Sequence, residues 1–180
     1  NIRAIPFRVE RQVHPSVVSK AKRALDIFGA IIGLMVTCLI AIPIAIAMQF
    51  DDPGQVFYSQ TRCGFNGKPF TIWKFRSMIA NEEKKKHLVK NQATGHIFKN
   101  ENDPRVTKVG YFLRRTSLDE FPQFWNVLKG DMSLVGTRPP TTAEVAMYED
   151  HHFERLKVKP GITGEWQVRG RSEILDFEDI

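Results

Sequence analysis

The sequence predicts an α+β protein, in which a mainly helical domain with one small β-hairpin follows a membrane-inserted helix. Three observations support this prediction. The chain has 180 residues, which is enough for one compact domain. A long apolar run lies near its start, and two strand-like runs separated by a turn come after it. Hydrophobic residues make up 42% and charged residues 26%, a composition that allows a packed core and excludes intrinsic disorder.

The apolar run covers residues 27–50, which include no charged residue. At about 1.5 Å per residue, a helix of this length reaches about 36 Å, enough to cross the hydrocarbon core of a bilayer. A buried helix of a soluble core is the alternative, but such a helix normally carries a polar stripe, and here the polar residues are Thr37 and Gln49. Gly29 and Gly33 form a small-x-x-x-small pair, which favours close helix contact.

Pro43 interrupts this run and predicts a bend or break, because proline has no N–H and its ring clashes with the carbonyl four residues back. The basic juxtamembrane segment, residues 1–26, is expected in the cytoplasm by charge bias. A straight crossing would then place residues 51–180 outside the cell, whereas a re-entrant helix keeps both flanks on one face. The residue pattern alone leaves both paths open.

The soluble part, residues 51–180, shows the signals of a hairpin and several short helices. A turn at residues 64–67 separates two β-prone runs, and a turn-rich connector is expected at 160–164. The expected strands are residues 55–60 and 70–76, and the expected helices are residues 80–92, 109–115, 120–128 and 142–157.

Positive charge concentrates in the middle of the chain, where residues 60–140 include 15 basic and 7 acidic side chains. Such a block attracts anions, such as nucleic acid, nucleotide-linked substrates or lipid headgroups. The densest basic run, residues 82–86, mixes both signs, and no nucleic-acid-binding signature is present, so we expect no nucleic-acid partner. Cys38 and Cys63 lack a C-x-x-C spacing, which argues against a disulfide scaffold or a zinc site.

The densest group of chemically active residues surrounds Asp119 and Glu120, at the start of an expected helix. Ser117 and Glu120 match a capping box. With Ser117 as the cap, however, Pro122 would have to donate a hydrogen bond to Leu118, so Asp119 is the expected N-cap. The positive potential of a helix start favours ionised carboxylates. On these residues alone, an ordinary cap beside a first-turn glutamate is the simpler explanation.

Six motifs occur in a distinctive order between residue 20 and the end of the chain. They are Lys22-Arg23-x-x-Asp26, Phe57-Tyr58-x-Gln60-x-Arg62-x-Gly64, Lys74-Phe75-Arg76-Ser77-Met78, Thr116-Ser117-Leu118-Asp119-Glu120-x-Pro122-Gln123, Asn126-Val127-Leu128-Lys129-Gly130-Asp131-Met132-Ser133-Leu134-Val135-Gly136-x-Arg138-Pro139 and Lys159-Pro160-Gly161-Ile162-Thr163-Gly164. In order and spacing this set resembles the bacterial sugar transferases, the monotopic polyprenyl-phosphate phosphoglycosyl transferases.

Two positions depart from the family pattern. The usual Ser-Pro pair corresponds here to Cys38-Leu39, and the proline is instead Pro43, about one helical turn later. The usual Gly-Pro-Arg-Pro reads with Thr137 in place of the first proline, which keeps Arg138 but alters the turn before it.

The resemblance implies an enzyme whose catalytic domain is residues 51–180, without the family's C-terminal portion. It implies transfer of a sugar 1-phosphate from a nucleotide diphosphate sugar, a UDP-sugar, to polyprenyl (undecaprenyl) phosphate, with release of UMP. This reaction is the first membrane step of exopolysaccharide, capsule or O-antigen assembly. The donor is cytoplasmic, so the catalytic domain is expected on the cytoplasmic face of the bacterial plasma membrane.

The resemblance also assigns roles to individual residues. Asp119 is the nucleophile that attacks the sugar-linked phosphate, and Glu120 helps to hold Mg²⁺. Arg114, Arg138 and Lys74 are the expected substrate-binding residues. A carboxylate nucleophile divides one difficult displacement into two, and a hard cation neutralises phosphate oxygens.

Two other functions use the same residues differently. A glycosidase needs two carboxyl groups about 5 Å or more apart on either side of a sugar, and Asp119 and Glu120 are poorly placed for that at one helix start. A non-enzymatic membrane-bound scaffold would use the basic block only to bind anionic lipid, with Asp119 as a cap. Activity with a nucleotide sugar separates the enzyme from the scaffold.

Overall fold

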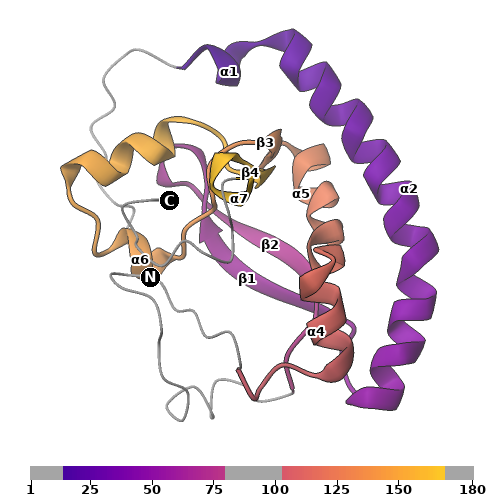
Figure 1. Cartoon of the computed structure of the whole chain (residues 1–180). Helices are drawn as coiled ribbons and strands as arrows, with labels where there is room; N and C mark the ends of the chain where they lie inside the picture. Colours follow the sequence, from indigo (N-terminus) through magenta and orange to yellow (C-terminus); the bar gives the residue numbers. More distant parts are fainter. Residues whose placement is uncertain (1–13, 80–102, 169–180) are drawn as a thin grey trace.

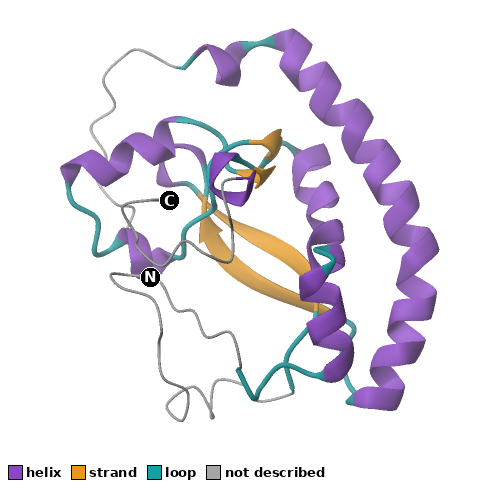
Figure 2. Cartoon of the chain, in the orientation of Figure 1, coloured by secondary structure: helices purple, strands orange, loops and turns teal. Residues whose placement is uncertain are grey.

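The computed structural model describes residues 14–79 and 103–168 (Figure 1). Helices and strands are both present, in agreement with the predicted α+β class (Figure 2). A short helix, α1 (Pro15–Val18), leads into the long helix α2 (Lys20–Asp51), and the strands β1 (Phe57–Cys63) and β2 (Pro69–Phe75) follow. With η denoting a 3₁₀ helix, the later elements are α4 (Lys108–Arg115), η3 (Leu118–Gln123), α5 (Phe124–Lys129), β3 (Ser133–Val135), α6 (Thr142–Val145), η4 (Asp150–Lys157), β4 (Gly161–Thr163) and α7 (Glu165–Val168).

The predicted hairpin is confirmed, and its first strand extends three residues beyond the predicted end. β1 and β2 are antiparallel, with Tyr58 opposite Lys74 and Arg62 opposite Phe70. Directly opposed side chains lie on the same side of a sheet, and positions four residues apart on a strand do so too. Arg62 and Lys74 therefore share one face of the hairpin, about 13 Å apart along the strands.

A second, parallel pair of strands joins β3 to β4, with Ser133 opposite Gly161. The expected turn-rich connector at 160–164 is therefore wrong, because a strand occupies most of it. The two backbones approach closely at this pair. A Cβ added to Gly136 would lie 2.2 Å from the carbonyl oxygen of Lys159, so only glycine fits there.

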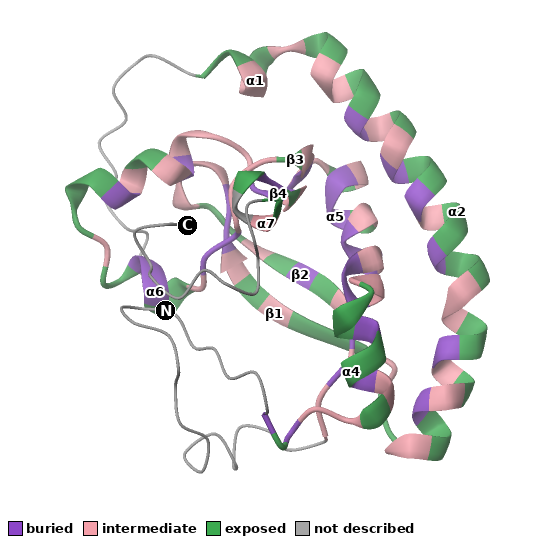
Figure 3. Ribbon diagram, viewed as in Figure 1, coloured by how far each residue is buried: buried purple, intermediate pink, exposed green. Residues whose placement is uncertain are grey.

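Two buried apolar clusters connect α2 to the rest of the chain, and the buried residues of α2 lie on the side that faces α5 and the hairpin (Figure 3). The predicted close contact at the small-residue pair is confirmed, since a Cβ added to Gly33 would lie 2.4 Å from Cγ of Phe124. One cluster contains Ala30, Ile72, Val127 and Met132, and the other contains Ile44, Met48, Phe75 and Leu113.

Polar contacts fix both ends of α2 to the same domain. Near the start of the helix, Arg23 donates two hydrogen bonds of 2.7 Å, to the carbonyl oxygens of Val127 and Leu128 at the C-terminal end of α5. At the other end, Oδ2 of Asp51 accepts a hydrogen bond of 2.8 Å from the backbone N–H of Val109 in α4. Arg23 and Asp51 lie about 42 Å apart along a regular helix, so the domain follows α2 over almost its whole length.

Buried or paired charges reinforce both of these ends. The buried carboxylate of Asp26 accepts hydrogen bonds from the hydroxyl of Ser133, at 2.9 Å, and from the backbone N–H of Leu134, at 3.0 Å. At the far end Asp52 forms an ion pair with Arg76. Removing one partner from such a contact leaves the other polar group without its bond, which costs about 1–3 kcal/mol.

Pro43, where the sequence predicts a bend or a break, does not end the helix. α2 is one continuous helix that begins at Lys20 and passes through Pro43, so the predicted break at this proline is absent. Both sides of Pro43 pack on the same domain, through Thr37 before it and Ile44 after it, and this shared support explains why the missing N–H does not end the helix.

Within the described residues, α2 is the one helix long and apolar enough to cross a membrane by length and composition. Its outer face is apolar and exposed from one end to the other. The exposed apolar side chains along this face include Leu25, Phe28, Ile32, Met35, Leu39, Ile42, Ile46 and Phe50. Their spacing of three and four residues forms one continuous stripe.

The later helices are shorter than predicted, although α4 matches the expected helix at 109–115. The predicted helix at 120–128 is the 3₁₀ helix η3 followed by α5, because Pro122 removes a backbone donor from the first turns. The predicted helix at 142–157 is interrupted between α6 and η4, where Glu149 and His152 form a new capping box. The helix predicted at 80–92 lies outside the described residues.

The contact between Gly33 and Phe124 generates a first prediction. Gly33→Leu should lower the thermal unfolding midpoint by about 5 °C, because overpacking at a closed contact costs about 1–3 kcal/mol. Leu39→Phe, on the exposed face of α2, is the matched control and should leave the midpoint unchanged. In a Phe124→Ala background the Gly33→Leu change should cost far less. Equal losses in the two backgrounds would contradict the contact.

Candidate active site

The expected helix-capping arrangement at the Asp-Glu pair is wrong. Ser117, not Asp119, occupies the N-cap position of η3, and its backbone has φ 58°, in the left-handed region that a residue other than glycine seldom adopts. Asp119 and Glu120 follow in the first turn of η3 and are 4% and 7% exposed. The sharp turn at Ser117 thus directs two adjacent carboxylates into the interior, and strained backbone of this kind is concentrated at functional sites.

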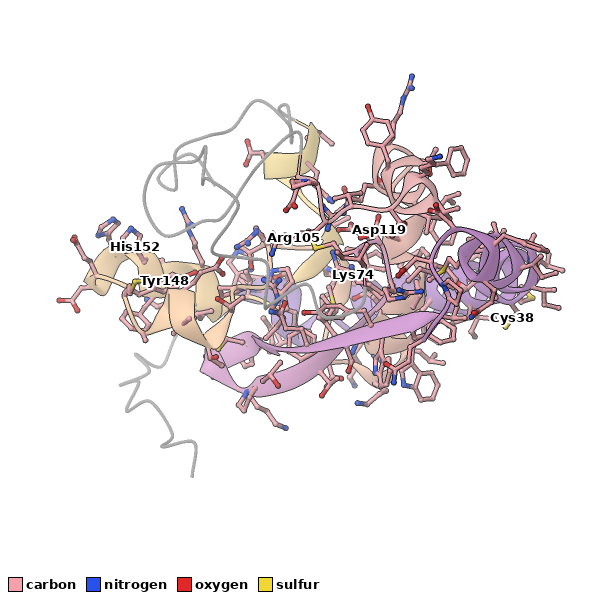
Figure 4. The ribbon with its side chains drawn as sticks, turned by 90° about the horizontal axis from the view of Figure 1, so that it is seen from below. Cys38, Lys74, Arg105, Asp119, Tyr148 and His152 are labelled. Atoms are coloured by element: carbon pink, nitrogen blue, oxygen red, sulfur yellow. The ribbon has the colours of Figure 1, made fainter. Side chains whose placement is uncertain are left out.

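Glu120 is held between side chains from two other elements. Nζ of Lys74, on β2, lies 2.8 Å from Oε1 of Glu120, and Nε2 of Gln167, on α7, lies 3.3 Å from Oε2. Asp119 and Lys74 lie close together near the centre of the molecule in Figure 4, between the hairpin and the helices. The structure therefore brings three predicted site residues together, Lys74, Asp119 and Glu120.

A pocket of about 310 Å³ opens beside this group. Glu120 and Gln167 contribute polar atoms to its wall, Ser117 lies at its edge, and Phe121 and Phe124 contribute apolar surface. A mainly apolar cavity beside a fixed carboxylate matches the usual character of a small-molecule site.

Arg114 and Arg138, the other two predicted residues, lie in different surroundings. Nε of Arg114 donates a hydrogen bond of 2.9 Å to the hydroxyl of Ser77, just after β2. Arg138 instead forms a two-pronged ion pair with Glu144 on α6, with N–O distances of 3.1 and 3.0 Å. Arg138 thus pairs with Glu144, whereas Lys74 pairs with Glu120.

Sequence reasoning missed three residues around this site. Gln167 gives no local signal. Glu144 could have been found, because Thr141 and Glu144 have the spacing of a capping box, and the structure contains that box. Arg62 stands inside one of the recognised motifs, but only the structure shows that its Nη1 lies 4.0 Å from Oε2 of Glu144.

For Glu144 and Arg62, burial and neighbouring opposite charges shift the pKa in opposite directions. Burial alone would raise the pKa of Glu144, but the hydrogen bonds and charge of Arg138, with help from Thr141 and Arg62, hold that pKa below its ordinary value. Burial lowers the pKa of Arg62, and the charge of Arg138 lowers it further, against the opposing effect of Glu144.

Glu120 is the candidate magnesium ligand, and its carboxylate is buried beside Asp119. Among the described residues no group of three His, Cys, Asp or Glu side chains could hold a metal ion. Mg²⁺ is usually held by one or two carboxylates together with substrate phosphates and water. A single carboxylate, Glu120, is compatible with an ion that takes most of its ligands from phosphate and water.

This combination of groups suits chemistry on phosphate. A buried carboxylate can act as a nucleophile, and the neighbouring lysine and arginines can stabilise negative charge on phosphate oxygens. The carboxylates of Asp119 and Glu120 are both deeply buried, and Glu120 lines the neighbouring pocket.

Comparison with known proteins places this chain among relatives with named activities. It is 55% identical over 162 residues to the galactosyl transferase CpsE of Streptococcus agalactiae. The aligned region covers 89% of this chain and 36% of that protein. The chain is 50% identical over 152 residues to the UDP-glucose:undecaprenyl-phosphate glucose-1-phosphate transferase of Escherichia coli, covering 83% of this chain and 31% of that protein. The chain thus spans about a third of the length of these two relatives.

A shorter relative is matched over most of its length. The exopolysaccharide production protein ExoY of Rhizobium meliloti is 37% identical over 160 residues, which cover 86% of this chain and 71% of that protein. The family described as bacterial sugar transferase matches residues 17–180. The match includes both carboxylates, the hairpin and α2, and the chain belongs to the bacterial sugar transferase family.

Proposed function

We propose that this chain is the catalytic part of a phosphoglycosyl transferase that moves a sugar 1-phosphate from a UDP-sugar to undecaprenyl phosphate. The reaction would release UMP and start a lipid-linked glycan for exopolysaccharide, capsule or O-antigen assembly. One observation carries the proposal: in a member of this family, the buried Asp119–Glu120 pair is fixed against Lys74 beside a pocket. The names of the relatives, which include undecaprenyl-phosphate sugar phosphotransferases, support the choice of acceptor.

The first half of the proposed reaction transfers the sugar phosphate to the protein. A carboxylate oxygen of Asp119 attacks the phosphorus that carries the sugar, a new O–P bond forms, and the bond to the nucleoside monophosphate breaks. UMP leaves with the bonding electron pair. Lys74 and Arg114 would bind phosphate oxygens during this displacement, and Lys74 also fixes Glu120.

The second half releases the sugar phosphate to the lipid. An oxygen of undecaprenyl phosphate attacks the same phosphorus, the bond to Asp119 breaks, and the carboxylate is restored. Glu120, together with the donor's phosphates, would hold Mg²⁺, which supplies charge neutralisation of phosphate oxygens when it is bound.

The contacts of α2 support a position on one side of the membrane. A helix that crossed the bilayer could not keep its two ends, at Arg23 and Asp51, bound to one water-soluble domain. We propose that both ends lie on the cytoplasmic face, while the exposed apolar stripe of α2 is buried in lipid. This arrangement keeps Asp119 on the side of the nucleotide sugar. The re-entrant path itself stays a prediction.

The covalent step predicts a trapped intermediate. Incubation with the donor alone should add the mass of one sugar phosphate to the wild-type protein, detected by intact-protein mass spectrometry. Asp119→Asn should show no adduct and should lower the rate of UMP release about 1,000-fold or more, because a neutral amide cannot act as the nucleophile. Near-normal turnover by Asp119→Asn, with no adduct on the wild type, would exclude this mechanism.

The metal assignment predicts dependence on both the ion and the carboxylate. Chelation with EDTA should stop UMP release, and added Mg²⁺ should restore it, because phosphate charge is then neutralised again. Glu120→Gln should remain inactive at any Mg²⁺ concentration. As a control, Glu154→Gln on the exposed part of η4 should behave like the wild type. Full activity in EDTA would refute the assignment.

The proposed topology predicts equal protection of both flanks of α2. Single cysteines at Ser16 and Gln55, in a protein with Cys38 and Cys63 replaced by alanine, should both resist a membrane-impermeant thiol reagent in intact cells. Both should react after lysis, since each flank is then accessible. Labelling of only one flank in intact cells would indicate a helix that crosses the membrane.

A further inference from the structure

The group formed by Arg62, Arg138 and Glu144 contains more positive charge than its own carboxylate can balance. Glu144 is 6% exposed, and each of its carboxylate oxygens accepts a hydrogen bond from Arg138. The backbone N–H of Thr141 donates a further bond of 2.6 Å to Oε2. Arg62 lies 4.0 Å from the same oxygen, so two guanidinium groups share one carboxylate. One arginine would be enough to neutralise Glu144, and the second leaves an excess of one positive charge.

Arg62 is also incompletely bonded. Its Nη1 donates to the carbonyl oxygen of Pro139 at 3.0 Å, but its Nε is buried and has no hydrogen-bond partner in the part of the chain that the structure describes. Buried donors are nearly always paired, and leaving one unpaired costs about 1–3 kcal/mol. Burial lowers the pKa of Arg62, with a further lowering by Arg138, which agrees with a charge that its surroundings do not fully balance.

The position of Arg62 connects this group to the active-site carboxylates. Arg62 and Lys74 extend from the same face of the hairpin, and Lys74 is bound to Glu120. The negative charge of Glu120 is close enough to act on Arg62. The hairpin face therefore has a lysine and two carboxylates at one end and an arginine pair at the other, about 13 Å away. A nucleotide diphosphate is long enough to lie between them.

We propose that Arg62 is a phosphate-binding residue for the nucleotide diphosphate donor, and that Glu144 is a positioning residue that holds Arg62 and Arg138 for this contact. The inference rests on the proposed function and extends it to two residues. A planar guanidinium offers two parallel N–H donors to phosphate oxygens, which lysine cannot do. The buried carboxylate fixes the orientation of both forks before the donor arrives, so less conformational freedom is lost on binding.

Binding of UDP to the protein in detergent, in the presence of Mg²⁺, tests this proposal by calorimetry. Arg62→Lys keeps the charge but loses the fork, and should weaken UDP binding about tenfold, the loss of one charge-assisted contact. Inorganic pyrophosphate, used as a competitor, should lose affinity by the same factor, because the contact is to phosphate and not to the base. Lys68→Ala, an exposed lysine in the hairpin turn, is the control and should bind UDP normally.

The positioning role of Glu144 has a separate readout. Glu144→Gln should raise the KM for the donor about tenfold even in samples shown to be folded, because both arginines lose their fixed orientation. A purely structural Glu144 would lower the thermal unfolding midpoint and leave the KM of the folded protein unchanged, which would overturn the positioning role. Should Arg62→Lys not fold, the Glu144→Gln result decides the proposal.

The possible failures are distinguishable. Active wild-type protein whose UDP affinity is unchanged by Arg62→Lys would overturn the inference and leave the proposed function intact. Wild-type protein that neither binds UDP nor transfers sugar phosphate from any nucleotide diphosphate sugar would overturn both.

Discussion

The attachment of α2 along one domain is the constraint on which the rest of this structure depends. Arg23 binds the C-terminal end of α5, Asp26 accepts bonds from β3, and Asp51 accepts one from α4. The contacts of Arg23 and Asp51 reach backbone groups at helix ends, where a helix leaves some of these groups without an internal partner. The apolar helix α2 therefore supports α4 and α5, the two helices on either side of η3.

This support explains how so small a domain holds two adjacent carboxylates in its interior. η3 is short and begins with a left-handed residue, Ser117, so it has little intrinsic stability. It lies between α4 and α5, both bound to α2, and it packs on β2, which provides Lys74. The burial of Asp119 and Glu120 therefore depends on contacts made by neighbouring elements and not on helix formation in η3 itself. Pre-formed surroundings of this kind are what a phosphoryl-transfer site requires.

Much of the fold could be predicted from the residues, because the signals were local. The hairpin and α4 follow from strand-like runs, a turn and a helical segment, and the contact at Gly33 follows from small-residue spacing. The continuity of α2 could not be predicted, since Pro43 favours a break unless tertiary contacts hold both sides. The helix predicted at 142–157 is divided for a local reason, because Glu149 and His152 form a capping box that begins η4.

In the candidate site, too, the sequence identifies some residues, whereas other contacts are visible only in the structure. The resemblance to a family identified Asp119, Glu120 and Lys74 as neighbours in function, and the structure places them together. The pairing of Arg138 with Glu144 was beyond sequence reasoning, because Glu144 lies outside the recognised motifs and only coordinates show which contact Arg138 makes. Arg62 was visible in a motif, but its excess charge appears only when the shared carboxylate is known.

A disulfide between α2 and α5 tests whether α2 lies against the domain when the protein is bound to the membrane. Cysteines at Gly33 and Phe124, in a protein with Cys38 and Cys63 replaced, would have Cβ atoms at most about 4 Å apart, which is within the reach of a disulfide. A Cβ at Gly33 lies 2.4 Å from Cγ of Phe124, and one C–C bond separates that Cγ from its own Cβ. Mild oxidation of isolated membranes should then form an intramolecular bond, seen as a mobility shift that a reductant reverses. If the two cysteines stay reduced while each reacts with a small thiol reagent, α2 is separated from the domain in the membrane, and the account is contradicted.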